Sequence, residues 1–532
     1  MKAFNRKERK GPVNRDAKVA KILIRLSLRS LRGFYRRNAS GGGLCALCGL
    51  FLGVLLLVSA CEVDHQFIVP IDNYPSINPD YTEVTIPFNI APLNFRVNET
   101  AEKLIVKITG RDQQTEFSFR GNKVRFREKE WSKMLKYSAG YDLEISVSIG
   151  HNDTLKVYKP FSIHLSEEKI DDYLVYRLIM PGFQNWNQRG IYKRDLASFR
   201  EETIIDSRIL PGTCVNCHTF AMNDPGNMVL HLREAYGGTI LYQDNKLEKL
   251  NTKAGKMFGN AAFPAWHPSK KYIAFSVNRV NQIFHAAGPH RAAAVDMKSD
   301  IFIYDIGKNE MLTSPALSAV DNFESFPCFS PDGTRLFYCT ADSVKLPQKF
   351  NKVRYSLCSV SFDPLTGLIS DKPDTLISSF KTGKSMSQPR VSPDGKFLMF
   401  VMADYGCFPS YNPEADLYLL DLETDVYKPL GILNSNNVES WHSWSSNGRW
   451  VVFSSRRGNG LHSNPYIAYI DENGVPAKPF LLPQKDPAFY NGFLFSYNVP
   501  EFVISKVALS PYAIERIARK TPAIQVQDSG GH

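Results

Sequence analysis

Short runs of alternating apolar and polar residues, separated by turn-forming residues, predict β-strands along most of the chain. Clear examples are residues 83–88, 103–108 and 142–149. In such a run every second side chain lies on the same face of a sheet, so the apolar side chains can cover a core. The spacing of the runs between residues 81 and 165 predicts a β-sandwich of the immunoglobulin-like type.

From about residue 172 the chain repeats a unit of two apolar strands joined by a small polar turn. The four clear copies are FPAWHPSKKYIAF at 263–275, FPCFSPDGTRLFY at 326–338, QPRVSPDGKFLMF at 388–400 and WHSWSSNGRWVVF at 441–453. Pro268, Pro331 and Pro393 occupy the same place in three units, 63 and 62 residues apart, and Ser446 follows 53 residues later. A supersecondary unit that recurs at such intervals predicts a β-propeller.

The turn inside each unit resembles that of the TolB-like propeller repeat, an aromatic residue followed by Ser-Pro-Asp-Gly. Residues 331–333 and 393–395 match it fully, and residues 268–270 and 446–448 match it in part. The Asp-Gly and Asn-Gly steps suit a tight turn that needs a positive φ. The resemblance implies an all-β propeller over residues 172–508. Weaker strand groups at 174–206 and 210–255 bring the expected count to six blades, and residues 488–508 are the candidate for closing the ring.

Residues 214–218 read Cys-Val-Asn-Cys-His, which is the attachment sequence of a c-type haem. Cys214 and Cys217 could form thioether bonds to a porphyrin, and His218 would then be the proximal iron ligand. The alternatives are a disulfide between the two cysteines or half of a zinc site. Zinc is less favoured because no second Cys-x-x-Cys pair follows residue 60.

In the repeat register, Cys217 and His218 align with Trp266 and His267, which places the motif on the innermost strand of a blade. The turn at residues 223–226 then replaces Pro-Asp-Gly. If that turn centres on residues 224–226, His231 lies on the same face as His218, which disfavours it as the second iron ligand. The distal ligand stays open, with a coordination position without a protein ligand as another possibility. The candidates are Met222, Met228, His231 and His267, together with His285 and His290.

Three further features lie around the motif in sequence or in the repeat register. Arg233 could pair with a haem propionate, because its planar fork suits a carboxylate. The insertion at residues 278–294 is basic and contains Gly288-Pro289-His290-Arg291. A long connection on a propeller is typical of a binding surface, to which Trp441 and His442 could contribute.

The N-terminus predicts export. Residues 1–43 are basic and acid-poor, residues 44–60 are apolar, and small residues precede Cys61, which is the order of a secretory signal peptide. Val58-Ser59-Ala60-Cys61 resembles a bacterial lipobox and implies lipidation of Cys61 and anchoring in the cell envelope, at the outer membrane. The alternative is a retained membrane anchor, for which 17 apolar residues are short. Residues 61–80 are expected to be a tether.

Cleavage changes the meaning of the net charge. The whole chain has a formal charge of +11, but residues 1–60 hold 13 of the 64 Lys and Arg and 2 of the 53 Asp and Glu. The remaining chain has 51 of each, so its charge does not indicate a nucleic-acid partner. An oxidising compartment permits disulfides. Cys328 and Cys339 flank a predicted hairpin turn and either bridge or remain buried thiols.

Two hypotheses for function follow. The first is an envelope lipoprotein whose propeller carries one covalent c-type haem, for electron transfer or for redox or ligand sensing, with a redox or envelope protein as partner. The second is a haem-free propeller scaffold that binds a protein, peptide or glycan. An enzyme that uses the haem, such as a peroxidase, is less favoured because the chain has no second Cys-x-x-Cys-His motif. No hydrolase, metalloprotease, phosphate-loop or EF-hand motif occurs that would indicate another enzyme. Residues 509–532 are expected to be an extension or a small cap.

Overall fold

The computed structural model describes residues 67–180, 189–255, 257–284, 292–346 and 348–529. The predicted signal peptide, the lipidation site Cys61, and His285 and His290 of the insertion lie outside the described residues. Within the described ranges, no helix is both long enough and apolar enough to cross a membrane.

Residues 67–166 form two β-sheets and one helix. The seven-stranded sheet contains β1 (Phe67–Ile71), β3 (Val84–Pro87), β5 (Lys103–Gly110), β6 (Gln113–Arg120), β8 (Leu143–His151), β9 (Thr154–Tyr158) and β10 (Phe161–Ser166). The smaller sheet contains β2 (Ile77–Asn78), β4 (Phe95–Val97) and β7 (Lys123–Val124). Helix α3 (Glu128–Tyr137) buries Trp131 and Leu135. This helix and the parallel pairs β1–β9 and β10–β3 are additions to the expected immunoglobulin-like pattern.

The predicted tether is wrong for residues 67–80. The apolar run Phe67–Ile71 pairs with β9 as an edge strand, and Ile77 is buried. Of the Pro, Asn and Asp residues that suggested a tether, Pro70 and Asn78 lie in β1 and β2, and the others between residues 72 and 80 form the connections between β1, β2 and β3.

The rest of the described chain forms six sheets of four or five strands, in which neighbouring blade strands are antiparallel. Blade 1 contains β11 (Tyr173–Ile179), β12 (Gly190–Asp195), β13 (Glu201–Asp206) and β34 (Ser496–Val503). Blade 2 contains β14 (Thr213–Ala221), β15 (Asp224–Glu234), β16 (Gly238–Gln243) and β17 (Lys246–Asn251). Blade 3 contains β18 (Ala262–Trp266), β19 (Tyr272–Phe284), β20 (Ala292–Asp305) and β21 (Glu310–Leu312).

The remaining blades have four strands each. Blade 4 contains β22 (Asn322–Phe329), β23 (Arg335–Asp342), β24 (Ser356–Ser361) and β25 (Asp374–Ile377). Blade 5 contains β26 (Ser385–Val391), β27 (Phe397–Ala403), β28 (Asp416–Asp421) and β29 (Tyr427–Pro429). Blade 6 contains β30 (Glu439–Trp444), β31 (Trp450–Ser455), β32 (Asn464–Tyr469) and β33 (Phe480–Leu481). Short helices connect strands: η2 (Phe350–Lys352), α4 (Ser379–Thr382) and α5 (Phe489–Gly492).

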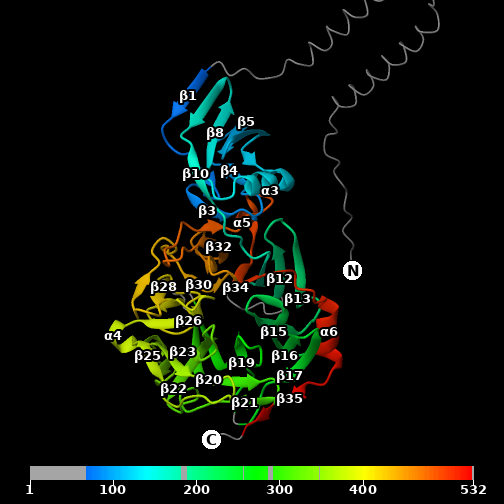
Figure 1. Cartoon of the computed structure of the whole chain (residues 1–532), viewed down its shortest axis with the longest axis vertical. Helices are drawn as coiled ribbons and strands as arrows, with labels where there is room; N and C mark the ends of the chain where they lie inside the picture. The colour runs from blue at the N-terminus through cyan, green and yellow to red at the C-terminus, as the bar shows by residue number, and fades with distance from the viewer. Residues whose placement is uncertain (1–66, 181–188, 256, 285–291, 347, 530–532) are drawn as a thin grey trace, which may run out of the picture. The chain divides into compact units, whose positions relative to one another are not determined.

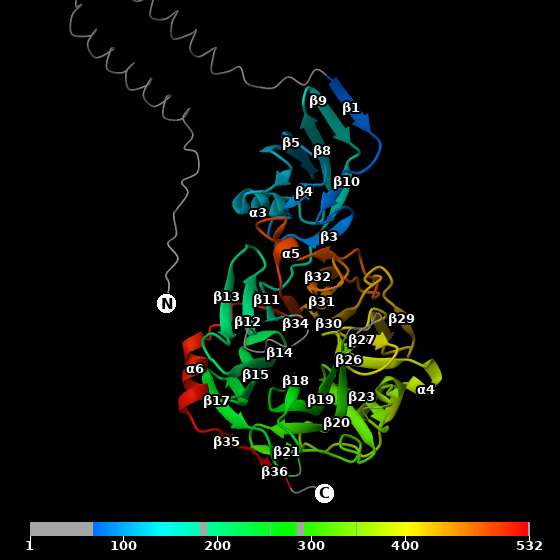
Figure 2. The ribbon, with the colours of Figure 1, turned by 180° about the vertical axis from the view of Figure 1, so that it is seen from behind.

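The blades follow one another in chain order around a common axis (Figures 1 and 2). Strand β34, from near the end of the chain, pairs with β11 and is the innermost strand of blade 1. The innermost strands contact one another in the cyclic order β34, β14, β18, β22, β26 and β30. The prediction of an all-β propeller is therefore confirmed, and the ring is closed by joining strands from both ends of the propeller sequence.

Every innermost strand carries a β-bulge at the same place, where two of its residues lie opposite one residue of the neighbouring strand. The six bulges are Asn216–Cys217, Phe263–Pro264, Phe326–Pro327, Gln388–Pro389, Trp441–His442 and Val499–Pro500. In all of them except that of blade 2, the first residue has a positive φ, between 46° and 56°. A bulge bends its strand and changes the direction of the side chains that it carries.

The predicted turns lie between the first and second strands of their blades. Gly333, Gly395 and Gly448 have φ values of 74°, 76° and 69°, as the Asp-Gly and Asn-Gly steps predict. Blade 3 has Lys270 in this position, with a φ of 61°.

The C-terminal segment covers the outer edges of two blades. Helix α6 (Pro511–Lys520) buries Ile514 and Ala518. Strands β35 (Ile524–Gln525) and β36 (Gln527–Asp528) pair with β17 of blade 2 and β21 of blade 3. Of the two expected forms, the described residues of this segment adopt the small cap.

Candidate functional site

The Cys-Val-Asn-Cys-His motif lies on β14, the innermost strand of blade 2. Aligned on the bulge, His218 is equivalent to Ala265, Cys328, Arg390, Ser443 and Glu501. The expected alignment of His218 with His267 is therefore wrong by two residues. The error arose at the turn, because blade 2 turns at Met222 and Asn223, whereas residues 224–226 already belong to β15.

Three spaces follow one another along the propeller channel, in the order in which β14 passes them. Asn216 lines a cavity of about 400 Å³ at one end, here called the arginine cavity. Cys217 and His218 line a narrow waist of about 10 Å³. Thr219, Phe220 and Met222 line a cavity of about 150 Å³ at the other end, here called the turn-side cavity.

The waist surrounds His218 mainly with apolar side chains, which include Phe263, Phe326, Trp441 and Val499 from the bulges of other blades, and Arg390 is its one cationic lining residue. The His218 side chain is fully buried, and neither ring nitrogen hydrogen-bonds to a described residue. Burial and the nearby charge of Arg177 lower the pKa of His218 to about 3, against a smaller opposing effect of the Val175 backbone, so the imidazole is neutral at physiological pH.

Arg177, Arg189 and Arg233 line the arginine cavity together with Asn216 and Asn498. They come from β11, the segment before β12, and β15, so the two neighbouring blades 1 and 2 supply all three. Arg189 also donates a hydrogen bond to the Cys214 sulfur, at 3.1 Å. Neither Arg177 nor Arg233 has a described carboxylate within 4 Å.

Arg177 is the most deeply buried of the three, with 5% of its surface exposed. Its guanidinium donates hydrogen bonds to the Asn216 side-chain oxygen and, at 2.6 Å, to the Asn498 side-chain oxygen. Its Nε has no partner among the described residues. Burial, with the neighbouring arginines, lowers the pKa of Arg177 to about 10, although it remains charged at physiological pH.

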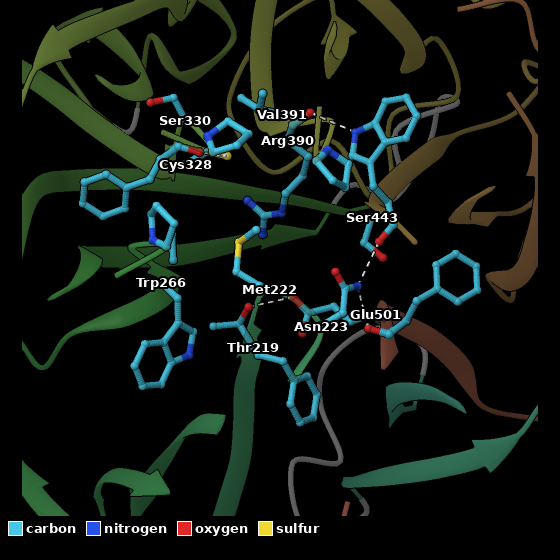
Figure 3. Close-up of a pocket in the computed structure, with 18 of the residues that line it drawn as sticks. Thr219, Met222, Asn223, Trp266, Cys328, Ser330, Arg390, Val391, Ser443 and Glu501 are labelled. Carbon is cyan, nitrogen blue, oxygen red and sulfur yellow. Dashed lines mark hydrogen bonds between the residues drawn. The ribbon is translucent and has the colours of Figure 1, made fainter. Parts of the chain in front are cut away.

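The turn-side cavity is lined by one acidic and one basic side chain, Glu501 and Arg390. Figure 3 shows Arg390 and Glu501 extending into this space, and Thr219 donates a hydrogen bond to Glu501 at 2.8 Å. Burial raises the pKa of Glu501 to about 7, partly offset by the charge of Arg390. The second Glu501 oxygen lies 4.0 Å from His218 Nε2 across the start of the waist.

The distal-ligand candidates do not converge on His218. Met222 is at the turn and half exposed, and Met228 pairs with Phe220 and packs in the core between blades 1 and 2. His231 lies opposite the bulge, on the other face of blade 2 from His218, and contacts Thr239 Oγ1 at 3.2 Å. The expectation that His231 shares a face with His218 is wrong, because the bulge shifts the register by one residue.

His267 contacts the Gly333 carbonyl oxygen at 3.0 Å and Ser269 at 2.7 Å, so both ring nitrogens are engaged between blades 3 and 4. His442 uses one ring nitrogen in this way, with its Nε2 3.0 Å from the Met399 carbonyl oxygen, whereas its Nδ1 has no partner among the described residues. Both are structural residues in this arrangement.

All six described cysteines are buried free thiols, including Cys214 and Cys217. Cys339 pairs with Ser325 across blade 4 rather than with Cys328, so the suggested hairpin bridge does not form. Burial raises the pKa of Cys339 well above its ordinary value.

A covalent haem would require both thiols and the imidazole to face a space that can hold a porphyrin. The chemistry of the donors is suitable, because a buried neutral imidazole without a hydrogen bond is available at His218. The space is not, because His218 and Cys217 line only the 10 Å³ waist, and neither cysteine nor His218 lines the arginine cavity. The motif therefore does not fit a porphyrin in the described arrangement.

The insertion continues strands β19 and β20 instead of forming a loop, as far as residues 284 and 292. Val280, Asn281 and Ala294 of this hairpin line the arginine cavity, as does Trp441. Arg233, expected as a partner of a haem propionate, and the insertion and Trp441, expected as a binding surface, thus line one cavity. Arg177, Arg189 and Asn498 also line it and were not predicted from the sequence.

A separate buried acidic pair lies in blades 3 and 4. Burial raises the pKa of Asp296 to about 7 and that of Glu324 to about 9. Within the described ranges, no three His, Cys, Asp or Glu side chains converge as metal ligands, either here or around Cys214.

Comparisons with known proteins identify no family. No protein-family model and no curated protein matches the sequence. Among solved structures, Porphyromonas gingivalis dipeptidyl peptidase 4 matches with 11% identity and a TM-score of 0.30, over 56% of this chain and 44% of that one. A candidate 6-phosphogluconolactonase from Bacteroides fragilis matches with 10% identity and a TM-score of 0.31, over 59% and 96%.

A puromycin-hydrolysing peptidase of Mycobacterium tuberculosis matches with 11% identity and a TM-score of 0.32, over 79% of this chain and 57% of that one. The match to dipeptidyl peptidase 4 spans less than half of the length of that protein. At such identities the similarities concern the β-propeller fold and carry no information about a ligand or a reaction. The fold of this chain is a β-propeller, and its function has to be argued from its own residues.

Proposed function

We propose that this chain is a ligand-binding propeller of the cell envelope, of TolB-like type, and that its ligand is a small anion held in the arginine cavity. The supporting observation is the environment of Arg177. This residue is buried, it lies beside Arg189 and Arg233, and no described carboxylate is within 4 Å of the Arg177 guanidinium. A buried charge without a counter-charge is costly, and a bound anion would compensate it.

The cavity has the properties of a preformed anion site. Asn216 and Asn498 orient the Arg177 guanidinium through their side-chain oxygens, so part of the ordering cost is met before a ligand arrives. Arginine forks suit carboxylate and phosphate groups, which can accept two parallel hydrogen bonds. A volume of about 400 Å³ lies at the small end of the range for small-molecule sites.

Isothermal titration calorimetry tests this function by measuring the affinity of the protein for citrate. The Arg233 side chain makes no hydrogen bond or ion pair to a described residue, so Arg233→Gln removes a cavity charge at little structural cost. Loss of one charge-assisted hydrogen bond, worth about 1.5–3 kcal/mol, should weaken citrate binding roughly 10- to 100-fold. The matched control is Arg120→Gln on the exposed strand β6, which should bind like the wild type. Absence of saturable citrate binding, or equal affinity in the Arg233→Gln variant, would reject the proposal.

The second candidate is the covalent c-type haem of an electron-transfer or sensor lipoprotein. Its support is the spacing of Cys214, Cys217 and His218 on one strand and the absence of any described hydrogen bond to the imidazole. Arg233 and Arg177 could hold carboxylate groups in this case too. The candidate requires the walls of the waist to separate from the described arrangement.

Intact mass and absorption spectra distinguish the two candidates. The protein should be produced in a host that has haem-ligation machinery and should be compared with the Cys214→Ala, Cys217→Ala double variant. A haem-sized mass increment and a Soret band that survives denaturation, both lost in the variant, would establish the haem. If the wild type and the double variant are both colourless and both have the mass of the polypeptide without haem, the haem candidate is rejected. Anion binding is then the only one of the two candidates that remains.

A further inference from the structure

The arginine cavity has a second wall, which is aromatic. Phe263, Phe408, Tyr411 and Trp441 line it, and they come from blades 3 and 6 and the connection between β27 and β28. The Phe263 and Trp441 rings are nearly parallel, at 19° and 6.1 Å between centroids, and Phe408 lies 5.5 Å from Phe263. The cavity is therefore cationic on blades 1 and 2 and aromatic on the other side.

The aromatic wall is held in place. The Trp441 indole nitrogen donates a hydrogen bond to Ser410 at 2.9 Å, and the Trp441 backbone nitrogen donates one to the Gln388 side chain at 2.7 Å. Arg456 lies 4.0 Å from the centre of the Tyr411 ring. Rings that are fixed before binding present a flat apolar surface without a large entropy cost.

A ligand that satisfies both walls has a charged end and a flat body. Inorganic phosphate or sulfate could meet the arginines but would leave the aromatic surface uncovered. An acyclic chain could cover the rings only by giving up rotational freedom. A ring that bears a carboxylate meets both requirements, and one or two rings suit a cavity of about 400 Å³.

We propose that the ligand is a small cyclic carboxylate, with its carboxylate at Arg177 and Arg233 and its ring against Phe263, Phe408 and Trp441. This inference rests on the proposed anion-binding function and narrows it to one class of compound. A sugar acid and an aromatic acid share this chemistry, so the test includes one of each.

The test is isothermal titration of the wild-type protein with glucuronate, gluconate and benzoate. Glucuronate and gluconate have the same number of carbons and the same charge, but only glucuronate forms a ring that keeps its carboxylate free. At least one of the two cyclic acids should bind 10-fold more tightly than gluconate. Phe408→Leu should weaken the binding of that cyclic acid several-fold without changing the binding of gluconate. The control Phe380→Leu, at a position on α4 that is 97% exposed, should change the binding of neither compound.

Gluconate or citrate binding as tightly as both cyclic acids would overturn this inference and leave the anion-binding function intact. Equal loss of all ligands in the Phe408→Leu variant would also overturn it, because the ring would then have no selective role. Absence of binding by every carboxylate, citrate included, would instead reject the proposed function itself. Preference for glucuronate or for benzoate would identify the source of the ring.

Discussion

Arg177 is the residue on which the proposed function depends most. Nothing in its own strand, Tyr173–Ile179, distinguishes it from an arginine that faces solvent. Its partners come from residues 216 and 498, on strands far away in the sequence. The sequence could therefore reveal Cys214, Cys217, His218 and Arg233, which lie in or near a local motif. It could not reveal a charge whose environment is created by ring closure.

Burial of the Glu501 carboxyl group in the channel predicts how the stability of the protein depends on pH. Its pKa is about 7 in the folded protein, above the ordinary value of 4.5, because burial disfavours the charged form. A carboxyl group with a raised pKa favours the folded state only while it is protonated. The stability of the wild type should therefore fall relative to that of Glu501→Gln as pH rises from about 4.5 to about 7, by on the order of 3 kcal/mol.

Urea denaturation of both proteins at several pH values within and beyond this interval measures the difference. Subtracting the variant removes contributions from Asp296 and Glu324, which titrate in both proteins. A difference in unfolding free energy that stays constant with pH would show that Glu501 does not have the environment described.

At the scale of elements, the repeat turns were predicted and the bulges were not. The Pro-Asp-Gly steps signal their own turns, because glycine is the residue that adopts a positive φ without cost. Four of the six bulges have proline as their second residue, which is a signal for a bulge within a strand. Blade 2 lacks this signal, because Cys217 takes the place of the proline. Alignment on the turn therefore displaced His218 by two residues, whereas alignment on the bulge places it correctly.

Two turn glycines give a matched comparison. Gly333 and Gly395 have almost the same φ, but a Cβ on Gly333 would lie 2.3 Å from His267 Nε2, whereas on Gly395 its nearest neighbour is at 3.9 Å. Gly395→Ala should cost about 1–2 kcal/mol for the backbone alone. Gly333→Ala should cost clearly more, because the His267 contact with the Gly333 carbonyl must also shift. Denaturation midpoints measure both, and equal costs would contradict the inter-blade contact.

At the scale of the whole molecule, closure of the ring brings the site together. Strand β34 contributes Asn498 to the arginine cavity and Glu501 to the turn-side cavity, and it completes blade 1. Four clear repeats and two weaker strand groups predicted six blades, with residues 488–508 as the candidate for closing the ring. Helix α3 and the parallel strand pairs of residues 67–166 were not predicted, because no repeated sequence pattern indicates them.

Phe502 tests the closure, because it is fully buried on β34. Phe502→Ala should lower the free energy of unfolding by about 3–5 kcal/mol, as expected for a large side chain lost from a packed core. Phe380→Ala, at an exposed site, should change it by less than about 0.5 kcal/mol. A small effect of Phe502→Ala on the denaturation midpoint would mean that β34 does not close the ring.

The most direct test of the central claim is a crystal of the wild-type protein soaked in sodium bromide and measured at the bromine absorption edge. We expect an anomalous peak in the arginine cavity, in contact with the Arg177 and Arg233 guanidinium groups. Bromide peaks elsewhere on the protein with none in that cavity, or a porphyrin bonded to Cys214 and Cys217, would contradict it.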